Sequence, residues 1–388
     1  FGKKKGGDGG HGHGDRDGDG PDEEEASEND DDDDDYLDPY YAYDDDVARH
    51  PRCRRPQWQR DTRPNCNDFH GDGFDAVSGD RGNRYISHGY FRDVFILRDG
   101  VGLRYVLKSL RIKPKDHRVG RSSLETVRQD ALVMDRLSSS PRIVDGYGHC
   151  GTSVLTEALA SEVERYVVTG NGRATRHEVD ENFGPRNDLT PGEKLTMALG
   201  MAEALADLHG HGGGVIVHDD VQLSQFLYGV DGTLKLNDFN RAEIMLYDEN
   251  RGEYCRYKNG GGYGNYRAPE EWADKPLNEK IDVYSFGNNV YGMLTGLEPF
   301  YTLDDDSVVQ KRMKRGETPF IDERYRKRSY AERKLAELLD GCWAFNPDGR
   351  ISIFEAREFL MEAVKENAKI MEAEKKKKKE EEEEEEEE

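Results

Sequence analysis

The chain has 388 residues, 35% of them hydrophobic and 35% charged, with a net charge of −24 and a mean hydropathy of −0.94. Residues 1–46 hold 19 acidic against 4 basic residues and residues 372–388 hold 11 against 5, so residues 47–371 carry only −3. This balance argues against a nucleic-acid partner, and no run of 18 apolar residues predicts a membrane span.

Both ends of the chain are predicted to be solvated tails. Residues 1–46 are rich in Gly, Asp and His, a composition that cannot bury a core. At the other end, five lysines precede nine glutamates in 375–388. Lys and Glu are good helix formers, so this block is expected to extend the helix predicted around 354–364 and to fray.

The five cysteines show no metal-binding spacing. Cys150, Cys255 and Cys342 are isolated, which is typical of small core side chains. Cys53 and Cys66 flank a leader rich in Arg, Pro and Trp, where a disulfide would tether it. The spacing does not decide between that disulfide and two free thiols. A disulfide would indicate a lumenal or extracellular location, with an upstream signal or anchor missing from this chain.

The first part of the main domain is predicted to be rich in strands. Segments 90–97 and 103–110 hold many Phe, Val, Ile and Tyr residues around a turn and predict an antiparallel hairpin. Apolar residues from Leu124 to Leu137 have helical spacing and end at Ser and Pro breakers. Two further strands are predicted around 144–147 and 152–157.

The second part is predicted to be mainly helical. A long helix over 191–209 is predicted to begin at Thr190-Pro191. Two short strands are predicted at 225–228 and 234–236, and the sequence after Pro269 is predicted to be helical. The expected fold class is α+β and bilobal, with a small antiparallel sheet and one helix, then a larger helical lobe.

Two segments carry the strongest functional signal. The first begins His218-Asp219-Asp220, and the second contains Asp238-Phe239-Asn240. They resemble the H-R-D catalytic loop and the D-F-G metal loop of the eukaryotic protein kinase family. Small-molecule kinases of the aminoglycoside and choline type share these aspartates, but they lack the later motifs described below.

The resemblance implies a role for each matching position. Asp220 would orient the incoming hydroxyl, and Asp238 would hold Mg²⁺. Gln225 stands where the family has a second metal ligand, an asparagine, and Leu227 would pack beneath the adenine of ATP. The expected cofactors are therefore ATP and Mg²⁺, with an unidentified protein substrate as partner.

The glycine loop over the phosphates is degenerate. Of the pattern G-x-G-x-x-G-x-V, only Gly89 and Val94 remain. Lys108 matches the lysine that pairs the α and β phosphates, and Val106 replaces a small alanine near the adenine. Glu157, at the end of a predicted strand, is also expected in the nucleotide site.

The helix carboxylate that should hold Lys108 falls at Asp130, with Glu125 as the alternative. Aspartate is one methylene shorter than the family's glutamate, so this ion pair needs a closer helix.

Three later positions carry structural roles implied by the resemblance. Glu270 belongs to an A-P-E motif and should pair with Arg350. Asp282 should anchor the catalytic loop. We divide the chain into an acidic tail (1–46), a leader (47–79), the two lobes of the domain (80–157 and 158–368) and a charged tail (369–388).

Several departures bear on activity. Asp219 replaces the arginine that receives an activation-segment phosphate, and the segment from Asp238 to Glu270 has no Ser or Thr. Tyr263 replaces a threonine and Gln222 replaces a lysine typical of Ser/Thr kinases. The sequence favours a divergent Mg²⁺-dependent protein kinase, with Ser/Thr preferred over Tyr as acceptor. The alternative is a pseudokinase that acts as a scaffold.

Overall fold

The computed structural model describes residues 53–54, 84–89, 91–98, 103–111, 121–259 and 264–387, all of which lie in one unit, Asp38–Glu388. The N-terminal tail, most of the predicted leader, Cys66 and Tyr263 lie outside these residues. Among the described residues, no helix is long and apolar enough to cross a bilayer.

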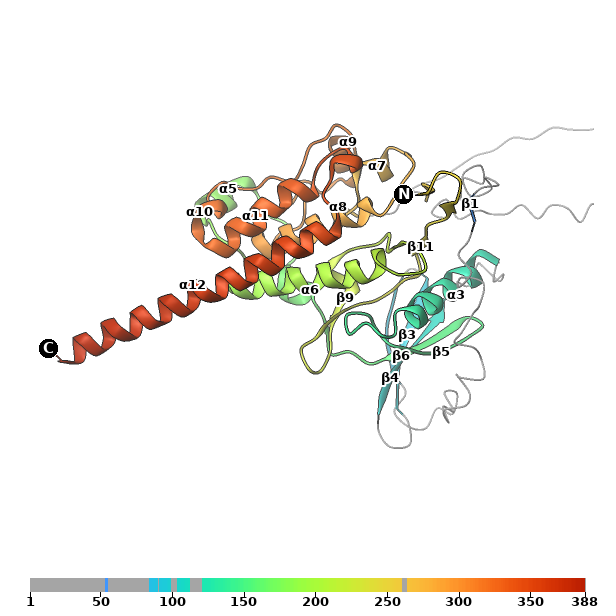
Figure 1. The fold of residues 1–388 in the computed structure, drawn as a ribbon, viewed down its shortest axis with the longest axis horizontal. Coiled ribbons are helices and arrows are strands. Elements are labelled where there is room, and N and C mark those ends of the chain that lie inside the picture. Colours follow the sequence, from blue (N-terminus) through green and yellow to red (C-terminus); the bar gives the residue numbers. More distant parts are fainter. Residues whose placement is uncertain are drawn as a thin grey trace, which may run out of the picture. The chain divides into compact units, whose positions relative to one another are not determined.

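An antiparallel sheet forms the first half of the domain. Its strands are β2 (Arg84–His88), β3 (Arg92–Arg98), β4 (Arg104–Leu110), β5 (Gly146–Cys150) and β6 (Ser153–Glu157). They are arranged in the order β2-β3-β4-β6-β5 (Figure 1). The predicted hairpin is confirmed as β3 and β4, whose register sets Val94 opposite Lys108.

One helix, α3 (Arg121–Arg136), packs against β5 and β6. Its buried apolar side chains include Val127, Ala131 and Met134, which share one face because they are spaced three or four residues apart. The same helix buries Asp130. The predicted helix is therefore confirmed, and it carries a charge into the protein interior.

The second half of the domain is helical. Its helices are α4 (Glu164–Val167), α5 (Arg176–Glu181), α6 (Pro191–His209), α7 (Pro269–Trp272), α8 (Lys280–Thr295), α9 (Asp306–Met313), α10 (Tyr325–Arg328), α11 (Tyr330–Cys342) and α12 (Ile353–Glu387). α6 begins with a capping box in which Thr190 and Glu193 bond to each other's backbone N–H, a strong helix start. It packs against α8, α11 and α12. The α+β bilobal prediction is confirmed.

Short strands frame the segments that carry the functional motifs. They are β7 (Ser161–Glu162), β8 (Ile216–Val217), β9 (Phe226–Tyr228), β10 (Leu234–Leu236) and β11 (Glu243–Ile244). β9 pairs with β10 and with β7, while β8 pairs with β11. The segment 218–225 therefore leaves one small sheet and enters the other, which fixes both of its ends.

A strand of the leader pairs with the segment between Asp238 and Glu270. β1 (Cys53–Arg54) is antiparallel to β12 (Tyr247–Asp248), which pairs with β13 (Glu253–Tyr254). The side chain of Cys53 and all of Cys66 are not described, so the choice between a disulfide and two free thiols lies outside the described residues.

The other cysteines partly correct the prediction. Cys342 is a free, buried thiol, as expected of a core cysteine. Cys150 and Cys255 each take part in a disulfide, although their isolated positions in the sequence predicted core thiols. Sequence spacing could not show this, because a disulfide depends on distances in the folded chain.

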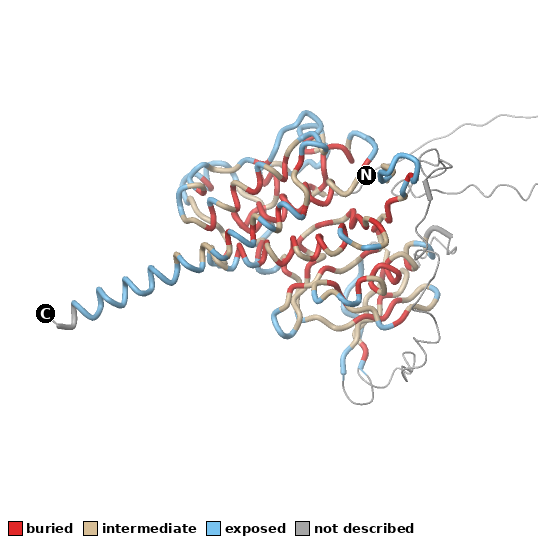
Figure 2. Tube along the Cα trace, viewed as in Figure 1, coloured by how far each residue is buried: buried red, intermediate tan, exposed pale blue. Residues whose placement is uncertain are grey.

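The last helix, α12, continues through the Lys/Glu block as the sequence predicts. Ile353, Ala356, Leu360 and Ala363 are buried in its first part, and residues 371–384 are exposed (Figure 2). Four Lys–Glu ion pairs with i,i+4 spacing link residues 376–383 at 3.3–3.6 Å. Such pairs stabilise an exposed helix modestly.

Candidate active site

Asp282 on α8 anchors the loop that contains Asp220. Asp282 accepts hydrogen bonds from the backbone N–H groups of His218 at 2.7 Å and Asp219 at 2.9 Å. Its Oδ2 also lies 2.8 Å from Nε2 of His209. These contacts hold Asp219 at a φ of 58°, a left-handed conformation that is uncommon for a residue other than glycine.

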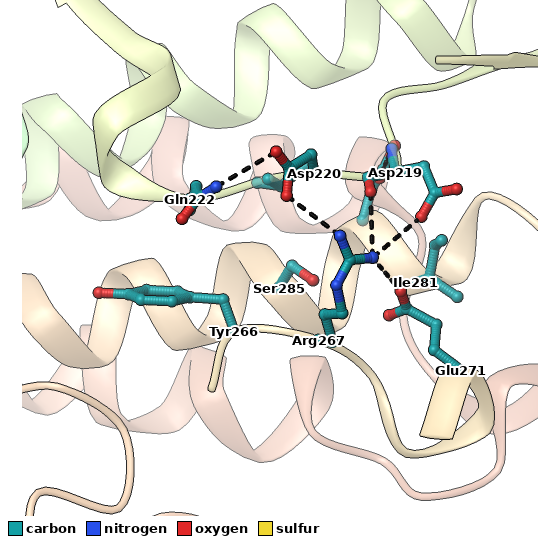
Figure 3. A pocket seen from close by; sticks show the side chains of 10 residues that line it. Asp219, Asp220, Gln222, Tyr266, Arg267, Glu271, Ile281 and Ser285 are labelled. Carbon is teal, nitrogen blue, oxygen red and sulfur yellow. Dashed lines mark hydrogen bonds and ion pairs between the residues drawn. The ribbon is translucent and has the colours of Figure 1, made fainter. Parts of the chain in front are cut away.

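Asp220 faces a pocket that Gln222, Tyr266 and Arg267 help to line (Figure 3). Its Oδ2 accepts from Nε2 of Gln222 at 3.2 Å and from Nε2 of Gln225 at 3.1 Å. Its Oδ1 lies 3.2 Å from Nη2 of Arg267. Gln225 uses its nitrogen here, so its amide oxygen stays outside this contact. The structure thus brings the two predicted residues, Asp220 and Gln225, together.

Asp238 directly follows Asn237, whose side chain accepts a hydrogen bond from Lys108. Its backbone has a φ of 64°, and its Oδ1 is buried without a hydrogen-bond partner. Burial raises the pKa of Asp238, Lys108 opposes this, and the neighbouring Asp130 and Asp220 raise the pKa further. A buried carboxylate oxygen without a partner calls for a missing cation or donor, so this atom fits the predicted Mg²⁺. No group of three or more His, Cys, Asp or Glu residues forms a metal cluster within the described part.

Lys108 and Asp130 are each paired, but not with each other. Nζ of Lys108 donates to Oδ1 of Asn237 at 2.6 Å. Oδ2 of Asp130 accepts from Nη1 of Arg92 at 2.7 Å, and its Oδ1 accepts from the backbone N–H of Phe239 at 2.8 Å. The predicted ion pair between Lys108 and Asp130 is therefore wrong. The longer side chain of Arg92 reaches the short carboxylate of Asp130 instead. The alternative, Glu125, pairs with Arg128 instead.

Burial on its own would raise the pKa of Asp130. The charges of Arg92 and Lys108 and the hydrogen bond from Phe239 reverse this, and the pKa lies below its usual value. Lys108 therefore acts on Asp130 through space, without a direct contact.

The other predicted nucleotide-site residues come from two sheets and a turn. Val94 and Val106 share one face of the five-stranded sheet with Lys108, and Leu227 lies on β9 of a separate small sheet. Gly89 donates its backbone N–H to the carbonyl of Arg92 at 2.8 Å and closes the turn between β2 and β3.

Glu157 is the exception among these residues. Its carboxylate accepts from Lys235 and from the backbone N–H of Asp145. Its side chain is therefore engaged by protein partners rather than directed toward a ligand.

The partners of Asp219 were not predicted from the sequence. This buried carboxylate has Oδ1 3.7 Å from Nη2 of Arg241 and 3.4 Å from Nη1 of Arg267, and its Oδ2 accepts from Asn259. Burial raises the pKa of Asp219, while the two arginines oppose the shift. The charge reversal at 219 was a usable signal, because a buried acid needs basic partners nearby.

Arg267 also links this cluster to the following motif. Its Nη1 lies 2.7 Å from Oε1 of Glu271, whose Oε2 accepts from the backbone N–H of Ala268 at 2.6 Å. Burial raises the pKa of Glu271 to about 7, against the opposing charge of Arg267. Next to it, Glu270 forms a buried two-contact ion pair with Arg350 at 2.7 and 3.1 Å, the two residues that the sequence pairs.

Comparison with known proteins agrees with this geometry. The family model "Protein kinase domain" matches residues 83–385. Dual specificity protein kinase shkE of Dictyostelium discoideum is 24% identical over 275 residues, which cover 67% of this chain and 34% of that protein. Serine/threonine-protein kinase CTR1 of Arabidopsis thaliana is 27% identical over 240 residues, covering 61% and 26%. Human receptor-interacting serine/threonine-protein kinase 1 is 27% identical over 237 residues, covering 58% and 32%.

The chain therefore belongs to the protein kinase family, since that model matches well over half of its length. The chain spans about a third or less of the length of these relatives.

Proposed function

We propose that the protein transfers the γ-phosphate of ATP to a protein hydroxyl, with Ser/Thr preferred over Tyr. The observation that carries this proposal is the buried Oδ1 of Asp238, which has no protein partner and lies within the electrostatic influence of Lys108 and Asp220. A protein without a cationic ligand gains nothing from such an atom. The similar proteins include Ser/Thr and dual specificity kinases, which supports this acceptor class.

Each residue has a distinct role in this proposal. Asp238 and the amide oxygen of Gln225 would hold Mg²⁺, which neutralises charge on the phosphates when bound. Lys108 binds phosphate oxygens, and Asp220 accepts the hydrogen bond of the incoming hydroxyl and orients it. Gln222 carries no charge where Ser/Thr kinases have a lysine, so we expect slow turnover.

The activation segment is proposed to be ordered without phosphorylation of Ser or Thr. Arg241 and Arg267 already neutralise Asp219, which is the position where an arginine would receive a phosphate. An added phosphate would meet this acid rather than a free arginine. Tyrosines are the remaining hydroxyls between Asp238 and Glu270.

A scaffold without transferase activity is the second candidate. The observation that favours it is the loss of two loop glycines, with Ser87 and Arg92 in their places. Side chains at these positions keep the backbone away from phosphates.

A compartment outside the cytosol is also proposed. The disulfide-bonded Cys150 and Cys255 support it, because disulfides persist mainly in oxidising compartments. Mass spectrometry of the protein from its native source under non-reducing conditions tests this location, since free thiols at both Cys150 and Cys255 would contradict it.

We also propose that the two lobes of the domain span residues 80–157 and 158–368.

The experiment for catalysis uses the full chain. We expect MgATP to raise the melting temperature of the wild type, because a ligand of the folded state stabilises it, and we expect Lys108→Ala to lose most of that shift. Asp220→Asn should keep ATP binding and lose phosphate transfer, while Asp238→Asn should lose the magnesium-dependent part of binding. Asp188→Asn, an exposed aspartate, is the matched control. No shift at millimolar ATP would favour the scaffold.

A further inference from the structure

Arg92 takes the place of a glycine over the nucleotide site. It is the first residue of β3, and two residues later Val94 lies opposite Lys108. Alternate residues of a strand share a face, so Arg92 lies on the sheet face that carries Lys108. Its side chain is only 4% exposed, which places a guanidinium inside the protein beside the proposed phosphate site.

The guanidinium is only partly satisfied. Nη1 donates to Oδ2 of Asp130 at 2.7 Å, but Nε and Nη2 are buried without a hydrogen-bond partner. Leaving a buried donor without a partner is unfavourable, and buried charged donors are rarely left so. Two free N–H groups on one planar fork match two oxygens of a phosphate or carboxylate.

The surrounding charges favour a phosphate. Arg92 and Asp238 influence each other electrostatically, and Lys108 acts on both Asp238 and Asp130. Asp130 bonds to Arg92 and to the backbone of Phe239, and Lys108 bonds to Asn237. Both cations therefore lie close to Asp238, whose Oδ1 has no partner. A polyphosphate with Mg²⁺ would satisfy all of them, because its oxygens accept from Arg92 and Lys108 while its metal meets Asp238.

We propose that Arg92 binds the phosphate oxygens of the nucleotide through Nε and Nη2, and so replaces the backbone contacts that the lost glycines would make. The proposal rests on the proposed function, because it assumes that ATP occupies this site. Asp130 is then a positioning residue for Arg92. Asp130 also bonds to the backbone of Phe239, so it links the phosphate contact to the segment that carries Asp238.

The test compares three ligands by titration calorimetry with the full chain: MgATP, adenosine and inorganic tripolyphosphate with Mg²⁺. Arg92→Lys keeps a charge for Asp130 but loses the fork. Arg92→Met with Asp130→Asn removes both charges, so no buried acid is left alone. Arg104→Met, at the exposed start of β4, is the matched control.

We expect both Arg92 variants to bind MgATP and tripolyphosphate about tenfold to a hundredfold more weakly, with adenosine binding unchanged. The control should match the wild type for all three ligands. A variant that binds MgATP and tripolyphosphate as tightly as the wild type would show that the ion pair with Asp130 is only structural, and an equal loss of adenosine binding would mean general damage. Either result overturns the proposal.

The two proposals fail in different ways. If the wild type transfers phosphate and the Arg92 variants bind polyphosphate equally well, the proposed function stands and the Arg92 assignment falls. If the wild type binds tripolyphosphate through Arg92 but transfers no phosphate, the assignment stands and the catalytic proposal falls. A wild type that binds neither MgATP nor tripolyphosphate overturns both.

Discussion

Two groups of buried charged side chains border the candidate active site, and each contains a substitution at a family position. The nucleotide-side group consists of Arg92, Lys108, Asp130 and Asp238. The activation-segment group consists of Asp219, Arg241, Arg267 and Glu271. An arginine replaces a glycine in the first group, and an acid replaces an arginine in the second. Both substitutions bury a charge, and both recruit an opposite charge from a distant segment.

The groups differ in how far their polar atoms are satisfied. In the activation-segment group, both carboxylate oxygens of Asp219 and of Glu271 have partners, and Nε of Arg267 is left without one. In the nucleotide-side group, Nε and Nη2 of Arg92 and Oδ1 of Asp238 lack partners. A satisfied group has the properties of a structural lock, whereas an unsatisfied group has those of a ligand site.

The largest expected effect is the loss of stability when the activation-segment group loses Asp219. Asp219→Ala leaves two arginines near a buried site without their shared acid, and removing one partner of a buried pair typically destabilises a protein by about 3–5 kcal/mol. Urea denaturation should show this loss with and without MgATP. The exposed Asp188→Ala should change the free energy of unfolding by less than about 0.5 kcal/mol. A loss below about 1 kcal/mol at Asp219 would mean that the group is not a lock.

A somewhat smaller effect is expected from Asp130→Asn. Asparagine keeps the shape but removes the charge that holds Arg92, and hydrogen bonds to charged groups contribute about 1.5–3 kcal/mol. Unlike the loss at Asp219, this loss should be accompanied by weaker MgATP binding. Denaturation and calorimetry on the same sample would distinguish the two groups. Unchanged nucleotide affinity would make Asp130 a purely structural residue.

The pH dependence of stability provides a third comparison. Burial raises the pKa of Glu271 to about 7, above the value near 4.5 expected in the unfolded chain. The folded state therefore binds more protons between these values, and stability falls as pH rises through this window. Between pH 5 and 7.5, the wild type should lose about 2 kcal/mol more than Glu271→Gln. Parallel pH profiles for the two proteins would contradict this.

The smallest effect is expected on the surface. Replacing Lys376 and Lys377 with Ala removes two of the exposed i,i+4 ion pairs of α12, each of which contributes about 0.3–0.5 kcal/mol to an isolated helix. The melting temperature should stay within about 1 °C, because α12 is anchored by buried residues near its start. A large shift would show that the exposed half of α12 supports the fold.

Much of the fold could be predicted because its signals are local. The spacing of Val127, Ala131 and Met134 predicts α3, and Thr190-Pro191 marks the start of α6. The pairing of Glu270 with Arg350 could also be predicted, since both positions match the family pattern. The structure shows that ion pair.

The family, the order of the elements and the functional candidates Lys108, Asp220 and Asp238 can all be inferred from the amino-acid sequence. Which charges meet is visible only in the folded chain: Lys108 with Asn237, Asp130 with Arg92, and Asp219 with two arginines. The physical reason is that a buried charge selects its partner by distance and reach in the folded chain. When one family position changes, the partner inferred for another position no longer follows from the sequence.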